Sequence, residues 1–189
     1  FYKNKILFLQ IFISSLPVMI VGFILVKTNY IDHIRNIETI AWTTLLFGIL
    51  LYLSDKFKTR RDIKNNFNLR SAIIIGFLQI LSLVPGVSRS GIAITAARFL
   101  EFKRVDSAKI SFLLSIPILG AVSIFGIKNI LYSESFYFSK INLVAIVFSF
   151  SFSLITIKYF IKFIKKFSLN IFSFYRIVLG LFLLSITYL

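Results

Sequence analysis

Long apolar runs divide the chain into segments of membrane-spanning length. A helix needs about 20 apolar residues to cross the roughly 30 Å hydrocarbon core of a bilayer. The segments that fit are residues 6–26, 37–53, 107–126, 141–160 and 171–188. Polar stretches separate each of them from the next. The pattern therefore predicts an all-α, polytopic membrane helix bundle, with residues 1–189 forming a single integral membrane domain.

The apolar region around residues 71–100 does not fit this scheme. Its first run, 71–84, stops at Pro85, and a second short run covers 92–100. At 1.5 Å per residue these runs reach roughly 21 Å and 14 Å, so neither crosses the bilayer alone. The region is either one broken spanning helix or a re-entrant hairpin, with its halves at about 71–84 and 89–100.

The distribution of Lys and Arg distinguishes these two arrangements. Cytoplasmic connections of membrane proteins carry an excess of Lys and Arg. The rich segments are 54–70, 98–109 and 158–170, against the poor segments 27–36 and 127–140. If the rich segments share one side, the chain enters and leaves the region between 71 and 100 on that side. The charge bias therefore favours the hairpin.

Composition narrows the functional classes. The chain is 58% hydrophobic and 15% charged, with a net charge of +15. Because its cations flank apolar segments, they indicate membrane topology and contact with anionic lipid, and we expect no nucleic-acid partner. The absence of cysteine excludes disulfides and thiolate catalysis, and the single histidine, His33, excludes a His-rich metal site. We interpret His33 and Asp32 as solvated loop residues.

The heptapeptide between the two short runs carries the candidate chemistry. It reads PGVSRSG, from Pro85 to Gly91. Pro85 ends the first half-helix, and Gly86 and Gly91 permit tight turns and close approach of a ligand. Ser88 can cap the second half-helix, whose free N–H groups form an anion site. Arg89 adds a planar guanidinium that matches phosphate oxygens.

An arginine at membrane depth needs a partner or a function, because burying its charge costs at least a few kcal/mol. Arg89 therefore either binds an anionic ligand, which we favour, or is satisfied by backbone carbonyls at the helix break. Gln79 either lines the cavity or bonds to a neighbouring helix. We interpret Arg176 as an interfacial residue rather than a ligand, and Ser14 and Ser15 as helix-packing residues.

Three segments together resemble the bacterial undecaprenyl-diphosphatase family of the bacitracin-resistance type. They are GFLQILSLVPGVSRSG at 76–91, SFLLSIPILGA at 111–121 and FYRIVLG at 174–180. The resemblance implies a multi-pass enzyme of the bacterial inner membrane. Such enzymes hydrolyse undecaprenyl diphosphate to undecaprenyl phosphate and phosphate, and so recycle the lipid carrier of peptidoglycan synthesis. It also implies two inverted repeats, each with a re-entrant helix pair, of which this chain holds the second.

The same resemblance assigns the site. It implies Ser88 and Arg89 as catalytic residues. The residues that would hold the diphosphate are Gly86, Ser88, Arg89, Ser90, Gly91 and Thr95. Thr95 stands in for a threonine that the family often has where this chain has Ala93. The implied partners are a polyprenyl diphosphate lipid and membrane lipids, the implied cofactor is Mg²⁺ or Ca²⁺, and a homodimer is one arrangement the family allows.

The chain also departs from the family pattern. The first repeat of the family carries a Glu-rich helix and a Ser-Ser-Ser-Gly-His loop, and neither is present. We therefore expect an N-terminally truncated chain, no metal ligands within it, and cation ligands in the missing N-terminal part. On this expectation the chain alone is a poor or inactive enzyme. A lipid-phosphate transporter or flippase, or an inactive truncated paralogue, is the alternative.

Overall fold

The computed structural model describes residues 2–28, 34–131 and 140–188. Within these ranges, five helices are long and apolar enough to cross a membrane. They are α1 (Tyr2–Lys27), α3 (Ile37–Asp55), α7 (Arg104–Leu131), α8 (Lys140–Lys166) and α9 (Asn170–Tyr188). Each contains one of the expected spans, and the described part of the chain contains no strand, only an isolated bridge. The predicted all-α membrane bundle is confirmed.

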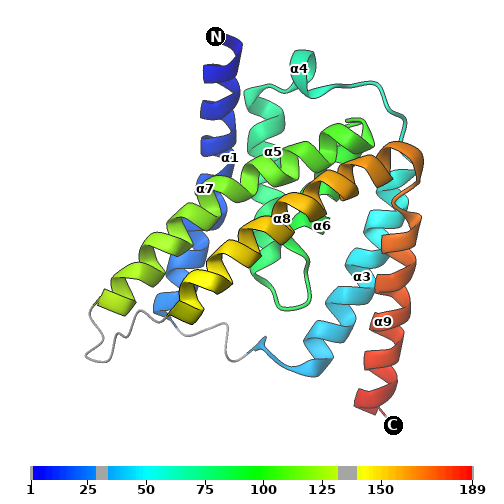
Figure 1. Cartoon of the computed structure of the whole chain (residues 1–189). Helices are drawn as coiled ribbons and strands as arrows, with labels where there is room; N and C mark the ends of the chain where they lie inside the picture. The colour runs from blue at the N-terminus through cyan, green and yellow to red at the C-terminus, as the bar shows by residue number, and fades with distance from the viewer. Residues whose placement is uncertain (1, 29–33, 132–139, 189) are drawn as a thin grey trace.

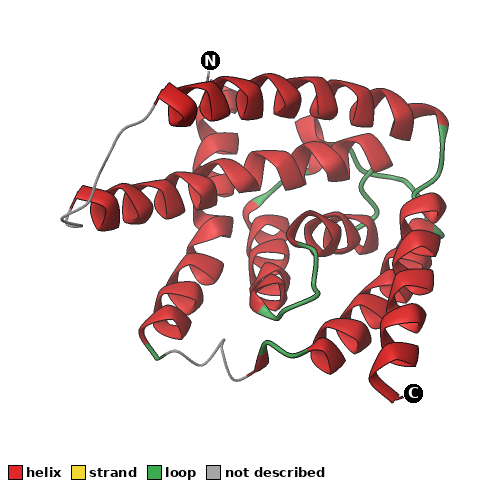
Figure 2. Cartoon of the chain, turned by 60° about the horizontal axis from the view of Figure 1, so that its bottom comes forward, coloured by secondary structure: helices red, strands yellow, loops and turns green. Residues whose placement is uncertain are grey.

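A short helical hairpin lies at the centre of this bundle. Its elements are α5 (Leu69–Gln79), the 3₁₀ turn η1 (Ile80–Leu83) and α6 (Arg89–Phe99). The loop between η1 and α6 lies between the α1, α7 and α8 group and the α3 and α9 pair, and the longer helices surround α6 (Figures 1 and 2). The irregular backbone of the loop is thus enclosed by protein, as membrane-embedded irregular segments require.

The chain enters and leaves the hairpin at the same end. The connection that leads from α3 to α5 is adjacent to the residues just after α6, since Arg61 forms a β-bridge with Phe102. The backbone N–H of Arg60 also donates to the carbonyl of Glu101 at 3.0 Å. One continuous spanning helix would put these residues on opposite sides of the bundle. The hairpin that the charge bias favoured is therefore the observed arrangement.

Small residues allow helix α1 to pack closely against α5. A Cβ atom at Gly76 would overlap the carbonyl oxygen of Ser14, so only glycine permits this approach. The Ser14 hydroxyl donates to the carbonyl of Ala72 at 2.6 Å. The Ser15 hydroxyl reaches the carbonyl of Leu114 in α7 at 3.5 Å. Both serines are fully buried, as expected for helix-packing residues.

A buried ionic cluster closes the end of the bundle where the chain enters the hairpin. Asp55, at the end of α3, accepts hydrogen bonds from Arg104 Nε at 2.7 Å and Nη2 at 2.9 Å. It also accepts one from the backbone N–H of Leu169, just before α9, at 3.1 Å. Arg98, near the end of α6, lies 3.5 Å from the same carboxylate. These contacts bring together the three cation-rich segments, which therefore share one end of the molecule.

The outer surface is apolar, as contact with lipid requires. Helix α8 shows this most clearly, because its central residues face outward. Phe148 is 58% exposed and Phe150 is 65% exposed. A soluble protein rarely exposes so continuous an apolar surface. The bundle is therefore built for a hydrocarbon environment, and its cation-rich connections lie at the end with the ionic cluster.

Candidate diphosphate site

The loop between η1 and α6 is fixed by α3. Gly86 has φ +87°, a left-handed conformation that side chains disfavour. A Cβ there would overlap Thr43 Oγ1 and lie 2.7 Å from the carbonyl oxygen of Ile40. The Thr43 hydroxyl donates to the carbonyl of Pro85 at 2.7 Å. Gly86 therefore serves the tight turn predicted for it, but the group that approaches it closely is helix α3 and not a ligand.

Ser88 caps helix α6 as predicted. Its backbone is extended, with φ −71° and ψ 123°, and its Oγ accepts a hydrogen bond from the N–H of Gly91 at 3.1 Å. The hydroxyl of Ser90 lies 3.3 Å from that of Ser88. The first N–H groups of a helix have no acceptor within the helix itself. Those of Arg89 and Ser90 thus lie at the positive end of α6, where an anion is favoured.

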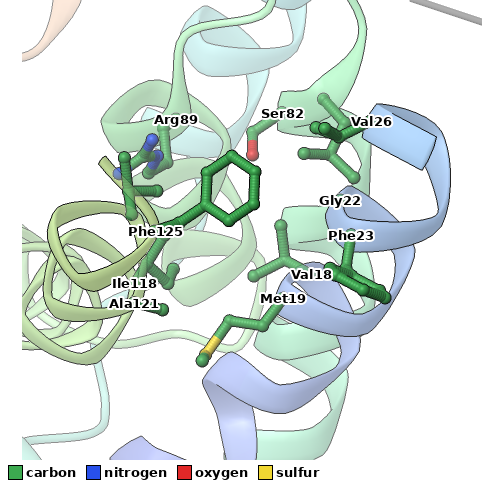
Figure 3. A pocket seen from close by; sticks show the side chains of 12 residues that line it. Val18, Met19, Gly22, Phe23, Val26, Ser82, Arg89, Ile118, Ala121 and Phe125 are labelled. Atoms are coloured by element: carbon green, nitrogen blue, oxygen red, sulfur yellow. The ribbon is translucent and has the colours of Figure 1, made fainter. Parts of the chain in front are cut away.

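Arg89 lies at an apolar cavity between α1, η1 and α7 (Figure 3). The cavity has a volume of about 330 Å³, and its walls include Val18, Gly22, Ile118 and Phe125. Arg89 is the one charged residue in its lining. Within the described ranges Arg89 forms no ion pair with a carboxylate. An unpaired, half-buried cation thus lies beside a space shaped for hydrocarbon.

Three other residues of the motif line a second, smaller cavity. It has a volume of about 220 Å³ and lies between the loop, α3, α8 and α9. Ser88, Ser90 and Gly91 line it together with Arg176. The motif therefore separates its polar groups, with the Arg89 side chain on one side of the loop and the serines on the other. The sequence did not predict this division.

Arg176 is the functional candidate that sequence reasoning misjudged. Its Nη2 donates to the carbonyl of Gly86 at 3.0 Å, and the side chain is partly buried. It is therefore directed at the loop, and the interpretation as an interfacial residue is wrong. The available signal in the sequence was one charged residue, Arg176, in the middle of the segment FYRIVLG. Only the packing of α9 on α3 shows that its guanidinium contacts the loop.

Two other predicted residues lie apart from these cavities. Thr95 is buried in α6 and lines neither of them. Gln79 is 1% exposed at the end of α5, and neither polar atom of its side chain has a hydrogen-bond partner. It lines neither cavity and bonds to no neighbouring helix in the described part of the chain. His33 and Asp32 lie outside the described residues.

The described residues contain few side-chain ligands for a divalent cation. They contain no group of three or more His, Cys, Asp or Glu side chains that could hold a metal ion. Of the two buried carboxylates, Asp55 is already bound by Arg104 and lies near Arg98, and Asp106 pairs with Lys109. The cation implied by the resemblance therefore does not fit the side chains around this loop.

Comparison with known proteins supports the resemblance. A family model described as "Bacitracin resistance protein BacA" matches residues 2–182. A protein of Pelagibacter ubique named undecaprenyl-diphosphatase is 45% identical over 187 residues, which are 98% of this chain and 73% of that protein. Proteins of the same name from Jannaschia sp. and Roseobacter denitrificans are 35% and 34% identical, over 97% and 98% of this chain and 68% and 70% of their own lengths. The chain belongs to the bacitracin resistance protein BacA family.

Proposed function

We propose that this chain acts in the hydrolysis of undecaprenyl diphosphate to undecaprenyl phosphate and inorganic phosphate, in the bacterial inner membrane. The reaction would return the lipid carrier to peptidoglycan synthesis. The observation that carries the proposal is Arg89, a cation at an apolar cavity that has no carboxylate partner within the described residues. A charged group inside a membrane protein is expensive and marks a functional site by default. The names of the relatives supply the substrate.

The geometry suits an amphiphilic diphosphate. The apolar cavity between α1 and α7 offers the hydrocarbon chain a wall of Val, Ile and Phe side chains. Arg89 and the N-terminus of α6 offer the diphosphate a guanidinium and backbone N–H groups. Both parts of the lipid would be accommodated at once, because Arg89 belongs to the lining of the cavity and also begins the helix.

In the proposed reaction a water molecule attacks the terminal phosphorus and gives its proton to a base, and the bond between that phosphorus and the bridging oxygen breaks. Undecaprenyl phosphate is the leaving group and takes the electron pair on the former bridging oxygen, and the attacked phosphorus becomes inorganic phosphate. If a side-chain hydroxyl attacks instead, water hydrolyses the resulting phosphoenzyme in a second step. Catalysis of phosphoryl transfer depends mainly on positioning and on neutralising charge. Arg89 would stabilise the negative charge that grows on the diphosphate oxygens.

We propose that the base and any divalent cation use carboxylates other than those that the described residues place near the loop. Glu101, Asp106 and Asp55 all lie at the far end of α6 from Ser88, in ion pairs with cations. No step is assigned to them. On this proposal the chain of residues 1–189 alone releases little phosphate.

The test is phosphate release from undecaprenyl diphosphate in detergent, with Mg²⁺ or Ca²⁺. It is run on this chain with and without the coding sequence upstream of Phe1. Each form is compared with its Arg89→Ala variant and with Arg70→Ala, a matched control that removes an exposed arginine from the same hairpin. We expect release to require the upstream sequence, to fall about 100- to 1,000-fold in Arg89→Ala as for loss of a charge-stabilising donor, and to survive in Arg70→Ala.

A lipid-phosphate transporter is the second candidate, because the described residues place a cation at the loop without a neighbouring carboxylate base. Retained binding of the lipid, with no phosphate release from any form, would favour the transporter. Release that is equal in Arg89→Ala and Arg70→Ala would remove Arg89 from the reaction.

A further inference from the structure

A polar cavity lies beside the ionic cluster, at the opposite end of α6 from the loop. It has a volume of about 510 Å³, a size typical of ligand pockets. Its lining comes from the end of α3 and the segment after it, the end of α6, the start of α7 and the last turn of α8. The three cation-rich segments meet at this end. The positive-inside rule therefore assigns the cavity to the cytoplasmic surface of the membrane.

The two carboxylates in the lining of this cavity are already engaged. The carboxylate of Asp55 lies 2.7 Å from Nε of Arg104 and 3.5 Å from Nε of Arg98. The carboxylate of Asp106 lies 3.6 Å from Nζ of Lys109, a residue outside the lining. Neither carboxylate is thus left to neutralise a further cation of the cavity.

Two lysines complete the charged lining of the cavity. Lys103 immediately precedes α7, Lys165 lies in the last turn of α8, and both are exposed. Within the described ranges neither lysine pairs with a carboxylate. Long cationic side chains at helix ends keep their charged heads at the membrane surface. The cavity therefore presents an excess of positive charge to the headgroup region of the bilayer.

Buried and backbone donors are also free at this cavity. Arg98 is 1% exposed, and its Nε has no hydrogen-bond partner. At the start of α7, the first helical hydrogen bond runs from the N–H of Ser107 to the carbonyl of Lys103 at 2.8 Å. The three N–H groups that precede Ser107 thus have no acceptor within the helix, and their residues line the cavity. Together with the positive end of the helix dipole, these groups favour an anion.

The last turns of α8 separate this cavity from an apolar groove. Ile164 and Lys165 line the cavity, whereas their neighbours Phe163 and Lys166 line the groove. The groove has a volume of about 630 Å³, and its walls are mainly aromatic, with Phe172 of α9 among them. Basic pockets between membrane helices on the cytoplasmic side bind anionic lipid headgroups. The groove distinguishes a lipid from a soluble anion, because only a lipid has an acyl chain to place there.

We propose that the cavity binds the headgroup of an anionic phospholipid, with Lys103 and Lys165 as the contacts to its phosphate and an acyl chain in the groove along α8. The bound lipid neutralises the excess charge of the cavity. It also connects the start of α7 and the end of α8 at the C-terminal end of α6. This site takes a membrane lipid that is not hydrolysed, and it is independent of the proposed reaction at the loop.

The experiment measures the binding of phosphatidylglycerol and phosphatidylcholine to the purified chain in detergent by native mass spectrometry. It compares Lys103→Gln, Lys165→Gln and the double variant with Lys5→Gln, which removes an exposed lysine of α1 that lines neither the cavity nor the groove. We expect the parent chain to prefer phosphatidylglycerol. Its affinity should fall about 5-fold in each single variant and about 25-fold in the double variant, as for lysines at an anionic lipid surface. Lys5→Gln should keep the parent affinity.

Three results would overturn the proposal. Equal losses of affinity in Lys165→Gln and Lys5→Gln would show that net charge alone attracts the lipid. Equal affinity of the parent chain for the two phospholipids would show that the cavity does not select an anionic headgroup. The third result concerns glycerophosphoglycerol, which is the same headgroup without acyl chains. If it competed at the affinity of the whole lipid, the cavity would belong to a soluble anion.

Discussion

The two ends of helix α6 surround their arginines in opposite ways. At its C-terminal end, Arg98 is 1% exposed and donates to the carbonyls of Phe102, Asp55 and Phe57 at 2.6, 2.9 and 2.7 Å. The Asp55 carboxylate lies beside it. At its N-terminal end, Arg89 and Arg176 have no carboxylate within the described residues. The first end pairs its arginine with a carboxylate, whereas the second has no such partner among the described residues.

This contrast shows how one short helix serves both structure and function. A buried charge that is paired with a carboxylate and hydrogen-bonded to several elements fixes those elements in place. Here those elements are the ends of α3 and α6 and the starts of α7 and α9. With its C-terminal end fixed, α6 can present an unneutralised N-terminus to the cavities. The ionic cluster thus fixes one end of the hairpin, and the loop at the other end has no such ion pairs within the described residues.

The strongest test of this contrast removes the carboxylate of the ionic cluster. In Asp55→Asn the charges of Arg98 and Arg104 lose their compensation, so the free energy of unfolding should fall by about 3–5 kcal/mol, as for a broken buried pair. Denaturant unfolding in detergent measures this. Glu101→Gln is the control, because its partner Arg60 is 64% exposed at 3.9 Å and a surface pair contributes about 1 kcal/mol or less.

Arg89→Ala should behave in the opposite way in the same unfolding experiment, with stability retained while phosphate release is lost. A small, equal loss of stability in Asp55→Asn and Glu101→Gln would contradict the structural role of the cluster. An unfolding defect in Arg89→Ala as large as that of Asp55→Asn would remove the distinction between the two ends.

The sequence predicted one end of α6 better than the other. Pro85, Gly86 and Ser88 carry their information locally, since a break, a turn and a cap each depend on neighbouring residues. The loop and the start of α6 were therefore predicted correctly. Gly91 was also predicted for a tight turn, but it lies within α6. Arg98 was counted among topology-setting loop charges, but it is buried. Its contact with Asp55 joins residues 43 positions apart, which no local pattern reveals.

The same reasoning explains the error at Arg176. Hydrophobic periodicity shows that a helix spans the membrane, but it does not show which helix it packs against. Arg176 reaches Gly86 across 90 positions of sequence. That contact exists because glycines at positions 48 and 180 let α3 and α9 approach each other. The family resemblance supplied residues of the motif, whereas the fold supplied the partner on α9.

A smaller effect is expected from adding one carbon to the loop. In Gly86→Ala the new Cβ would overlap Thr43 Oγ1, and the φ of +87° would be strained. We expect a loss of about 1–3 kcal/mol in stability, the usual cost of such a backbone conformation. Phosphate release should fall as well, because the shifted loop would lose the hydrogen bond between the Gly86 carbonyl and Arg176.

Gly120→Ala is the matched control for this change. Gly120 lies within α7, and a Cβ added there would have nothing within 4 Å, so the substitution introduces no clash. It should leave stability unchanged or raise it by about 0.5–1 kcal/mol through helix propensity. Equal results for Gly86→Ala and Gly120→Ala would show that the loop conformation does not depend on this glycine.

The smallest expected effect concerns a carboxylate near the ionic cluster but outside it. Asp62 caps the short helix α4 (Ile63–Asn66), and the hydrogen bond from the backbone N–H of Asn65 lowers the pKa of Asp62 below its ordinary 3.8. A lowered pKa means that the charged carboxylate stabilises the folded cap. This contribution is present above the ordinary pKa and is lost as the pH falls through the lowered value. The protection factor of the Asn65 amide, which corrects the exchange rate for its slower intrinsic value at low pH, should therefore fall on acidification.

Asp62→Asn should remove this pH dependence and keep the cap, because asparagine is also a good N-cap residue. The amides of α6 should show no change, since Asp62 is not buried and forms no ion pair with Arg98 or Arg104. If the amides of α6 instead lost protection together with those of α4 on acidification, the connection between α3 and α5 would also help to fix the C-terminal end of α6. The contrast between the two ends of α6 would then extend beyond Asp55 and its arginines.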